Sequence, residues 1–352
     1  MSKILVTGGA GFIGSHTCLV LLESGYDLVV IDNYANSSPE ALRRVVELVG
    51  PEAEDRLKFI QGDIRFNSDL ERAFSLATNT GNGIDAVIHF AGLKAVGESI
   101  VEPLKYWDNN VCGSQNLLAM MRSYNCRTLV FSSSATIYGN AELSPIAESA
   151  SILPINPYGF TKAAVEQMLS DVATSEVGWR IACLRYFNPA GAHHSGRIGE
   201  DPNGIPNNLF PIVNQVAVGK RDQVQVFGGD WPTPDGSGIR DYIHVMDLAE
   251  GHLAALNRML AGGDQLLQLN LGSGQGNSVL DVIEAFARAS GKSIPYVITQ
   301  RRSGDVGITI ADPSLAKRHL GWETKRDLYE ICLDGWAWQR SNPAGYSSDK
   351  SP

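Results

Sequence analysis

The sequence predicts an α/β protein built on a doubly wound parallel sheet, with a smaller C-terminal α/β domain after it. Three observations support this fold class. The stretch Lys3–His16 combines a short apolar run, three glycines and the start of a helical pattern. Strand and helix patterns then alternate through the first half of the 352-residue chain, as in parallel sheets with crossover helices. From Asn188 onward the alternation gives way to longer stretches rich in Gly, Pro and Asn.

The opening stretch predicts a Rossmann-like site for a dinucleotide. Ile4–Val6 is an apolar run typical of a buried strand, and Phe12 begins a helical pattern. Gly8, Gly11 and Gly14 lie between them at three-residue spacing, a variant usual in short-chain dehydrogenase/reductases. Such a loop lets the backbone approach a pyrophosphate, whose charge then faces the helix N-terminus. A tight turn also uses glycine, so the triplet alone is a weak signal.

The second strand indicates which dinucleotide is bound. Tyr26–Ile31 is predicted to be this strand, and it ends at Asp32. A carboxylate about 20 residues after the glycine loop accepts hydrogen bonds from the adenosine ribose hydroxyls. It would repel a ribose 2′-phosphate, which favours NAD over NADP. The alternative is that Asp32 only begins the polar turn Asp32–Asn36, but the preceding glycines favour the cofactor.

The remaining elements bring small and polar residues to one edge of the predicted sheet. The fourth strand ends in Ala91-Gly92 and the fifth in Ser132–Ser134. Ligands bind at the carboxyl ends of parallel strands, so these residues are expected to line the site. Further strands are predicted at 57–60, 84–90, 127–132 and 180–185, and helices at 69–77, at 106–124 and from Asn156 onward.

Tyr158 and Lys162 form a Y-x-x-x-K pair near the start of a helix. Asn156 suits the N-cap and Pro157 the first helical position, so the pair lies on one helical face. A tyrosine hydroxyl titrates at about pH 10, and a lysine one turn away, an oxidised nicotinamide and the helix N-terminus would each favour the phenolate. Together with Ser134, the pair can remove an alcohol proton while a hydride leaves for NAD. The alternatives are surface packing for the pair and a polar turn for the serines.

The composition argues against several classes of partner. With a net charge of −9 and a pI near 5.3, we expect no nucleic-acid or anionic-membrane partner. No apolar run reaches transmembrane length, and we expect no signal peptide before the first strand. The five cysteines contain no C-x-x-C, so we expect reduced thiols in a cytoplasmic protein. The seven histidines show no metal-binding spacing, and no metal is expected.

The change of character near Asn188 predicts a domain boundary. We assign residues 1–187 to an NAD-binding domain and residues 188–345 to a second domain. A segment near residues 240–262 could pack with the first domain instead of the second. The long stretch after Asn188 lacks periodicity, and such loops are usually functional or disordered, so we favour a ligand-binding segment. No element is expected after about Pro343.

Six long blocks of sequence carry a resemblance to a known family. They are Thr7–Thr17, His89–Ser99, Phe131–Thr136, Leu184–Pro189, Gly204–Leu209 and Arg240–Leu248. On these blocks the chain resembles the UDP-glucose 4-epimerases (UDP-galactose 4-epimerases) of the extended short-chain dehydrogenase/reductase superfamily, from residue 3 to about residue 340. Blocks of this length are far more specific than any single short motif.

The resemblance implies an NAD-dependent isomerase that interconverts UDP-glucose and UDP-galactose. NAD stays bound and is not consumed. Tyr158 takes the proton of the sugar 4-hydroxyl while C4 hydride passes to the nicotinamide; the 4-keto sugar rotates, and hydride returns to its opposite face. Lys162 and Ser134 complete the catalytic set, with Thr136 as a helper. The family is commonly a homodimer packed through the helices near Tyr106 and Tyr158.

The resemblance also implies two sets of binding residues. The cofactor set comprises Gly8, Gly11, Phe12, Ile13, Gly14, Asp32, Asn33, Asn36, Ser37, Asp63, Ile64, Phe90, Ala91, Gly92, Lys94, Asn109, Ser134, Tyr158, Lys162 and Phe187. The substrate set, which would hold the UDP-hexose, comprises Ser134, Tyr158, Asn188, Asn208, Leu209, Phe227, Arg240, Arg302, Asp305 and Thr309. The two arginines can fork onto a diphosphate, although without the resemblance they would be ordinary surface charge.

Thr309 departs from the pattern of many epimerases restricted to unmodified hexoses. Those enzymes carry a bulky tyrosine at this position. A small residue leaves room beside the C2 substituent of the sugar, so we hypothesise that UDP-N-acetylglucosamine and UDP-N-acetylgalactosamine are also accepted. The alternative is that neighbouring residues fill the space.

Other functions on the same scaffold stay open at this point. A sugar-nucleotide dehydratase shares the Tyr158–Lys162 pair, but it typically carries Asp-Glu where this chain has Ala135-Thr136. A decarboxylating or net-oxidising relative would consume cofactor or release NADH. A non-catalytic NAD-sensing protein often lacks the tyrosine–lysine pair, which this chain keeps.

Overall fold

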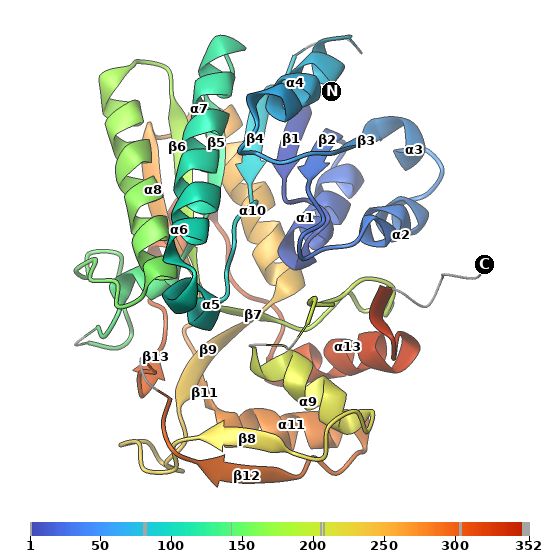
Figure 1. Cartoon of the computed structure of the whole chain (residues 1–352), viewed down its shortest axis with the longest axis vertical. Coiled ribbons are helices and arrows are strands. Elements are labelled where there is room, and N and C mark those ends of the chain that lie inside the picture. The colour runs from blue at the N-terminus through green and yellow to red at the C-terminus, as the bar shows by residue number, and fades with distance from the viewer. Residues whose placement is uncertain are drawn as a thin grey trace.

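A large parallel sheet is the layer that positions the rest of the molecule. The computed structural model describes residues 2–79, 83–141, 143–204, 206, 208–302 and 305–346. Among these residues, seven parallel strands form one sheet in the order β10-β6-β5-β4-β1-β2-β3 (Figure 1). The strands are β1 (Lys3–Thr7), β2 (Asp27–Asp32), β3 (Leu57–Gln61), β4 (Ala86–His89), β5 (Thr128–Ser134), β6 (Arg180–Tyr186) and β10 (Leu266–Leu271).

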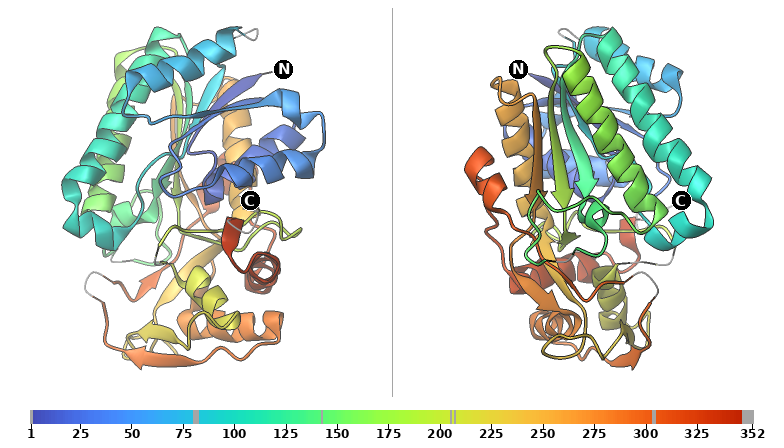
Figure 2. Two further views of the ribbon diagram at one scale, coloured as in Figure 1. Left: turned by 45° about the vertical axis from the view of Figure 1, so that its right-hand side comes forward. Right: turned by 90° about the vertical axis from the view of Figure 1, so that its left-hand side faces the viewer.

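Side-chain alternation along the strands divides the core into two layers. In β1, Ile4 and Val6 belong to one apolar cluster and Leu5 to the other, because successive residues of a strand point to opposite faces. The helices α1 (Phe12–Glu23), α2 (Pro39–Val49) and α10 (Val245–Leu260) pack into the first cluster, whereas α4 (Asn67–Asn79), α7 (Gly113–Ser123) and α8 (Pro157–Ser175) pack into the second. Figure 2 shows the sheet edge-on between these helices. Burial on both faces explains the nearly continuous apolar runs of the strands.

The strand order reverses between β1 and β4. From β1 the sheet continues to β2 and β3 on one side, and to β4, β5, β6 and β10 on the other. In open α/β sheets the crevice outside the carboxyl ends at such a switch point receives ligands. The reversal therefore fixes where a dinucleotide can bind.

The segment before α7 is more broken than the single helix predicted at 106–124. Helices α5 (Val96–Val101) and α6 (Pro103–Tyr106) precede a π-helical turn, η1 (Trp107–Cys112), which leads directly into α7. Pro103 has no N–H to donate, which accounts for the break between α5 and α6. Single π-helical turns are frequent at functional sites. The short elements α3 (Ala53–Arg56) and η2 (Ala135–Tyr138) precede β3 and follow β5, respectively.

A second region lies beyond the carboxyl ends of the large sheet (Figure 1). Within the described ranges it contains a small sheet of β7 (Asn188–Ala190), β9 (Ile239–His244), β11 (Gly276–Ser278) and β13 (Ile308–Thr309), and a separate pair of β8 (Val224–Phe227) and β12 (Tyr296–Thr299). Its helices are α9 (Leu209–Ala217), α11 (Val279–Ser290) and α13 (Leu328–Ser341). They enclose an apolar core of their own that includes Val213, Phe286 and Trp336.

The chain returns from this second region to the large sheet. Helix α10 packs against α1, and β10 pairs in parallel with β6 as the edge strand. Helix α12 (Ser314–Leu320) then packs against both α10 and β10. The return therefore reaches beyond the expected 240–262 segment, because an edge strand completes it.

The expectation of no ordered structure after Pro343 is wrong for Tyr346. Its ring is buried beside Trp338, with ring centroids 4.7 Å apart, and the Arg44 guanidinium lies 5.2 Å from its centroid. Residues 347–352 lie outside the described residues. No helix in the described ranges combines the length and apolar character needed to cross a membrane.

Candidate active site

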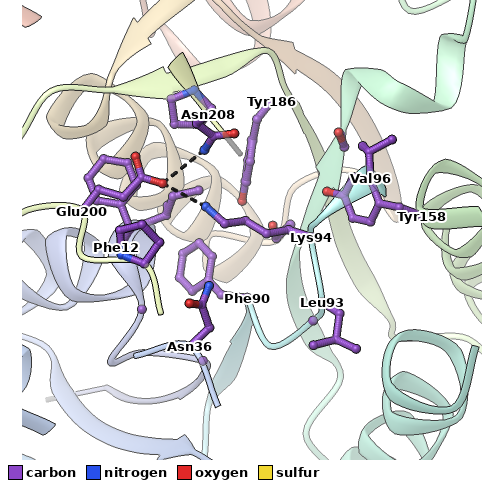
Figure 3. A pocket seen from close by; sticks show the side chains of 18 of the residues that line it. Phe12, Asn36, Phe90, Leu93, Lys94, Val96, Tyr158, Tyr186, Glu200 and Asn208 are labelled. Carbon is purple, nitrogen blue, oxygen red and sulfur yellow. Dashed lines mark hydrogen bonds and ion pairs between the residues drawn. The ribbon is translucent and has the colours of Figure 1, made fainter. Parts of the chain in front are cut away.

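The large sheet and the second region enclose one cavity of about 510 Å³ between them. Its walls come from the glycine loop, the carboxyl ends of the sheet strands, the start of α8 and the loops of the second region. Figure 3 shows side chains from both regions converging on this space. The cavity lies at the switch point of the strand order, where the sequence predicts that the dinucleotide binds.

The glycine loop forms a cradle that has no room for side chains. Gly8 has a φ of +70°, and a Cβ there would lie 2.7 Å from the backbone nitrogen of Ala91. A Cβ on Gly14 would lie 2.3 Å from the carbonyl oxygen of Gly8. Gly11 is the N-cap of α1 and offers no side chain to satisfy the first N–H groups of the helix. The cradle therefore fits a pyrophosphate, which would accept from these groups.

The carboxylate of Asp32 is fixed at the end of β2. It accepts hydrogen bonds from the backbone nitrogens of Ala10 at 3.0 Å and Tyr34 at 2.9 Å, and from Ser37 Oγ at 2.7 Å. These contacts hold an acceptor beside the glycine loop, where an adenosine ribose would lie. Asp63, at the end of the next strand, accepts from Asn33 Nδ2 at 2.9 Å.

Asp63 is also held by an arginine. Arg65 donates to its carboxylate from Nη2 at 2.8 Å and from Nε at 3.0 Å. Burial would raise the pKa of Asp63, but the hydrogen bonds from Arg65 and Asn33 outweigh burial and lower that pKa to about 2. The carboxylate is therefore ionised at neutral pH and available to position the loop around it.

Tyr158, Ser134 and Thr136 form a hydroxyl cluster at the centre of the cavity. Thr136 Oγ1 donates to Ser134 Oγ at 2.9 Å, and Ser134 lies close enough to Tyr158 to affect the pKa of its hydroxyl. The side chain of Asn156 caps α8 by accepting from Gly159 N at 2.9 Å, which fixes the helix start that carries Tyr158. Burial raises the pKa of Tyr158, and Ser134 offsets part of the rise.

Lys162 lies one helical turn from Tyr158, but its Nζ is not hydrogen-bonded to the tyrosine hydroxyl. Its Nζ donates to the Ser132 carbonyl at 2.7 Å and lies 6.0 Å from the Tyr158 ring centroid. Burial lowers the pKa of Lys162 to about 8, and the nearby carboxylate of Glu166 limits the fall. The expected fall in the tyrosine pKa is therefore absent here, because desolvation of the phenol dominates. Additional positive charge inside the cavity is needed to make Tyr158 a base.

A buried ion pair supports the catalytic end of α8. Arg185 Nη2 and Glu166 Oε2 are 2.6 Å apart, and both side chains are almost completely buried. Ser133 Oγ donates to the same carboxylate at 2.5 Å. These contacts tie β5 and β6 to α8. They therefore fix the position of the serines at the end of β5 relative to the tyrosine–lysine pair.

The substrate side of the cavity is built from side chains of the second region. Arg302 pairs with Asp305 through Nε and Oδ2 at 3.0 Å, and its guanidinium carbon lies 4.5 Å from the Phe227 ring centroid. Burial lowers the pKa of Arg240, whose Nη1 donates to the Ile239 carbonyl at 2.9 Å. Asn188 Nδ2 donates to the Asp241 carbonyl at 3.1 Å.

The structure brings together the proposed site residues with one exception. The catalytic set Ser134, Thr136, Tyr158 and Lys162 lines the cavity. So do Gly8, Gly11, Phe12, Ile13, Gly14, Asp32, Asn33, Asn36, Ser37, Asp63, Ile64, Phe90, Ala91, Gly92, Lys94, Asn109 and Phe187 of the cofactor set. Asn188, Asn208, Leu209, Phe227, Arg240, Arg302 and Asp305 of the substrate set line it as well.

Thr309 is the exception, and the geometry does not support its assignment as a contact residue. It lies on β13 beside Arg240 of β9, and it is not among the residues that line the cavity. Gly238 and Arg240 form the wall at this point. A threonine is too short to extend past them.

Several lining residues were missed by sequence reasoning. Tyr186 ends β6, and its hydroxyl hydrogen-bonds His252 Nε2. Its place at the carboxyl end of an apolar strand was a signal that could have identified it. Glu200 and Tyr346 also line the cavity, but they come from stretches without periodicity, where no local pattern singles them out.

The chain is similar to known proteins over most of its length. A model described as "NAD dependent epimerase/dehydratase family" matches residues 4–272. The chain is 55% identical to the UDP-glucose 4-epimerase of Bacillus subtilis (strain 168) over 98% of this chain and 99% of that protein.

Solved structures extend the comparison to the three-dimensional fold. One is a UDP-glucose 4-epimerase from Bifidobacterium longum in complex with NAD⁺ and UDP, with a TM-score of 0.91 and 48% identity over 98% of this chain and 100% of that one. Another is a UDP-glucose 4-epimerase from Stenotrophomonas maltophila with NAD and formylated UDP-arabinopyranose, with a TM-score of 0.92 and 46% identity over 97% and 99%.

Proposed function

Because the chain belongs to the NAD dependent epimerase/dehydratase family, we propose that it is an isomerase that interconverts UDP-glucose and UDP-galactose. One observation carries this proposal. The hydroxyl cluster of Ser134, Thr136 and Tyr158 lies where the cofactor side and the substrate side of the cavity meet. The names of the relatives and the ligands in their structures support the same activity.

The cofactor side fits a tightly bound NAD that is not consumed. The glycine cradle and α1 would hold the pyrophosphate, and Asp32 would accept from the adenosine ribose. Lys162 and Asn109 would border the nicotinamide half. We assign this work to residues 1–187 with the returning α10 and β10, and UDP-sugar binding to the rest of residues 188–345.

The substrate side fits a nucleoside diphosphate. Arg240 and Arg302 can each place two N–H donors on phosphate oxygens. Phe227, whose ring already stacks on Arg302, offers an apolar face to a uracil ring. Asn188 and Asn208 supply amide groups that can bind phosphate or sugar oxygens. These contacts would hold the UDP while leaving the hexose beside Tyr158.

The hydroxyl cluster would move the proton of the sugar 4-hydroxyl. NAD⁺, when bound, would supply the hydride acceptor and a positive charge beside Tyr158. That charge would counter the effect of burial on the tyrosine pKa, so that Tyr158 can accept the proton and later return it. Ser134, held by Thr136, would hydrogen-bond the same hydroxyl. Lys162 would add a positive charge near Tyr158 at neutral pH.

The dehydratase alternative is less well supported. Loss of water would need an acid and a base in addition to the tyrosine. At the matching place this chain has Ala135 and Thr136, and the Thr136 hydroxyl donates to Ser134. A hydroxyl so engaged is a poor general acid.

An NMR time course of the purified protein with UDP-galactose and no added NAD tests the function. We expect UDP-glucose to form, and the two sugars to approach a fixed ratio without net NADH. Absence of conversion even after NAD is added would contradict the proposal. Formation of a 4-keto-6-deoxy sugar would point instead to the dehydratase.

We further infer that the cavity accepts a sugar with an N-acetyl group at C2. Thr309 stays clear of the cavity, so no bulky side chain at this position limits the space. We expect wild-type protein to turn over UDP-N-acetylglucosamine, and Thr309→Tyr to lose that activity while it keeps activity on UDP-galactose. Failure of the wild type to turn over the N-acetylated sugar would refute the inference.

The proposed assembly is a homodimer. The helices near Tyr106 and Tyr158 expose large apolar residues, including Ile100, Leu104 and Phe160, and Leu104 is 82% exposed. Exposed apolar residues gathered on adjacent helices usually mark an interface. Sedimentation velocity should give twice the monomer mass, and Leu104→Glu should reduce it.

We also propose a cytoplasmic location, because the five cysteines are free thiols.

A further inference from the structure

One carboxylate oxygen joins the two sides of the cavity. Glu200 Oε1 accepts from Lys94 Nζ at 3.1 Å and from Asn208 Nδ2 at 3.1 Å (Figure 3). Lys94 follows β4 on the cofactor side, whereas Asn208 precedes α9 on the substrate side. Glu200 thus contacts one proposed binding residue from each side.

Glu200 belongs to a segment that is fastened at both ends. Residues 199–203, here called the strap, are held from behind because Trp338 Nε1 donates to the Glu200 carbonyl at 3.2 Å. The Tyr346 hydroxyl donates to the Gly199 carbonyl at 3.2 Å. At the other end, Asn203 N donates to Asn36 Oδ1 at 2.8 Å.

The other end of the strap therefore reaches the loop proposed to hold adenosine. Asn203 Nδ2 also donates to the Ala35 carbonyl at 3.0 Å. Both Ala35 and Asn36 line the cofactor side of the cavity. The strap consequently spans from the C-terminal segment of the chain to the loop after β2, along the cofactor side of the cavity.

Two features indicate that Glu200 does more than fill space. Its side chain is only 9% exposed, and it places a negative charge in the wall of a cavity proposed to hold two diphosphates. Asn208 occupies the N-cap of α9, but its side chain makes no cap hydrogen bond and donates to Glu200 instead. An asparagine at an N-cap ordinarily accepts from the helix. The hydrogen bond to Glu200 therefore takes the place of the N-cap hydrogen bond that an asparagine at this position usually makes.

We propose that Glu200 is a positioning residue that couples NAD retention to occupancy of the UDP site. A UDP group bound at Asn208 and α9 holds Asn208 in place. Asn208 then holds Glu200, and Glu200 holds Lys94 and the strap over the cofactor. This inference rests on the proposed function, because it takes NAD and a UDP-sugar as the two ligands.

The coupling has a measurable consequence. If UDP holds the strap closed, UDP must tighten the binding of NAD, and bound NAD must tighten the binding of UDP by the same factor. The tighter binding of NAD is expected to be seen as slower release. Coupling between sites typically changes affinity by about 5- to 150-fold. We expect UDP to slow NAD release from the wild-type protein by about 5-fold or more.

The experiment measures NAD release from the purified holoprotein, with and without saturating UDP. Released NAD is trapped by an excess of an alcohol dehydrogenase and its alcohol substrate, which reduce it, and NADH absorbance is followed. In Glu200→Gln, which keeps the acceptor for Asn208 but removes the charge, we expect UDP to change the release rate by less than about 2-fold. Lys94→Met, at a half-exposed position, should lose the UDP effect in the same way. The double variant should show no further loss.

Glu323→Gln is the matched control, since Glu323 forms an exposed ion pair with Lys317 at 2.6 Å, away from the cavity. It should keep the wild-type response. If UDP slows release equally in the wild type, Glu200→Gln and Lys94→Met, the proposal is wrong. If the wild-type protein binds neither NAD nor UDP, the proposed function fails instead. Circular dichroism separates both outcomes from misfolding.

Discussion

The two sides of the cavity are built in different ways. The cofactor side depends mainly on backbone geometry. It has a glycine with positive φ, glycines at which an added Cβ would clash with the backbone, and a carboxylate held by backbone N–H groups. The substrate side depends on side chains that hold one another, such as Arg302 with Asp305 and Phe227. Substitutions on the cofactor side should therefore act by changing the shape of the backbone, whereas substitutions on the substrate side should act by removing single contacts.

The largest effect is expected from Gly14→Ala, because the clash is with backbone. The new Cβ would lie 2.3 Å from the Gly8 carbonyl, so the cradle has to open. We expect purified protein with almost no bound NAD and with epimerase activity below detection; NAD is quantified by chromatography after denaturation. Gly97→Ala is the control, since nothing lies within 4 Å of the Cβ it would carry. Stoichiometric NAD in Gly14→Ala would break the comparison.

Tyr158→Phe tests the point where the two sides meet. Removing the hydroxyl removes the proton acceptor without changing the ring packing, so kcat should fall by about 10²- to 10⁴-fold while NAD and UDP remain bound. Steady-state rates with UDP-galactose and calorimetric titration with UDP measure the two quantities. Tyr329→Phe, at an exposed tyrosine, should leave both unchanged. A Tyr158→Phe variant with wild-type kcat would contradict the proposed mechanism.

A pH titration of stability sharpens the comparison at Lys162. Burial lowers the pKa of this lysine to about 8 in the folded protein, below the value of about 10.4 in an unfolded chain. Between these values the unfolded chain binds more protons, so the free energy of unfolding rises with pH; below about pH 8 the full cost of burying the charge remains.

Lys162→Met should remove this dependence. From about pH 8 to about pH 10, the wild-type free energy of unfolding should gain on the order of 2 kcal/mol relative to the variant. Urea unfolding of NAD-free samples of both proteins at each pH gives this difference in the free energy of unfolding. Parallel curves for the two proteins would show that the lysine is not buried as a charge.

The smallest effect is expected from Arg302→Met on the substrate side. Arg302 is about half exposed, so its loss should weaken UDP binding by about tenfold, in line with a single charged hydrogen bond. Bound NAD and the thermal midpoint should not change. Titration with UDP measures the affinity, and Arg258→Met, in an exposed ion pair with Asp264, is the control. Loss of NAD from Arg302→Met would remove the distinction between the two sides.

Elements with a local signal could be predicted from the sequence alone. A strand, three glycines and a helix predict the cradle, because only glycine permits that backbone path. The acid after the second strand and the tyrosine–lysine pair four residues apart follow from strand ends and helical periodicity. The family resemblance supplied the substrate residues, which neither periodicity nor spacing indicates. Positions such as Asp32 and Tyr158 could therefore be named before any fold was known.

Contacts between segments far apart in the chain became visible only in the folded structure. It brought Glu200 between Lys94 and Asn208, returned β10 to the edge of the sheet and buried Tyr346 beside Arg44. It also kept Thr309 away from the cavity and showed that burial outweighs Lys162 in setting the pKa of Tyr158. These features depend on desolvation and on packing between residues far apart in the chain. No local pattern in the sequence encodes either.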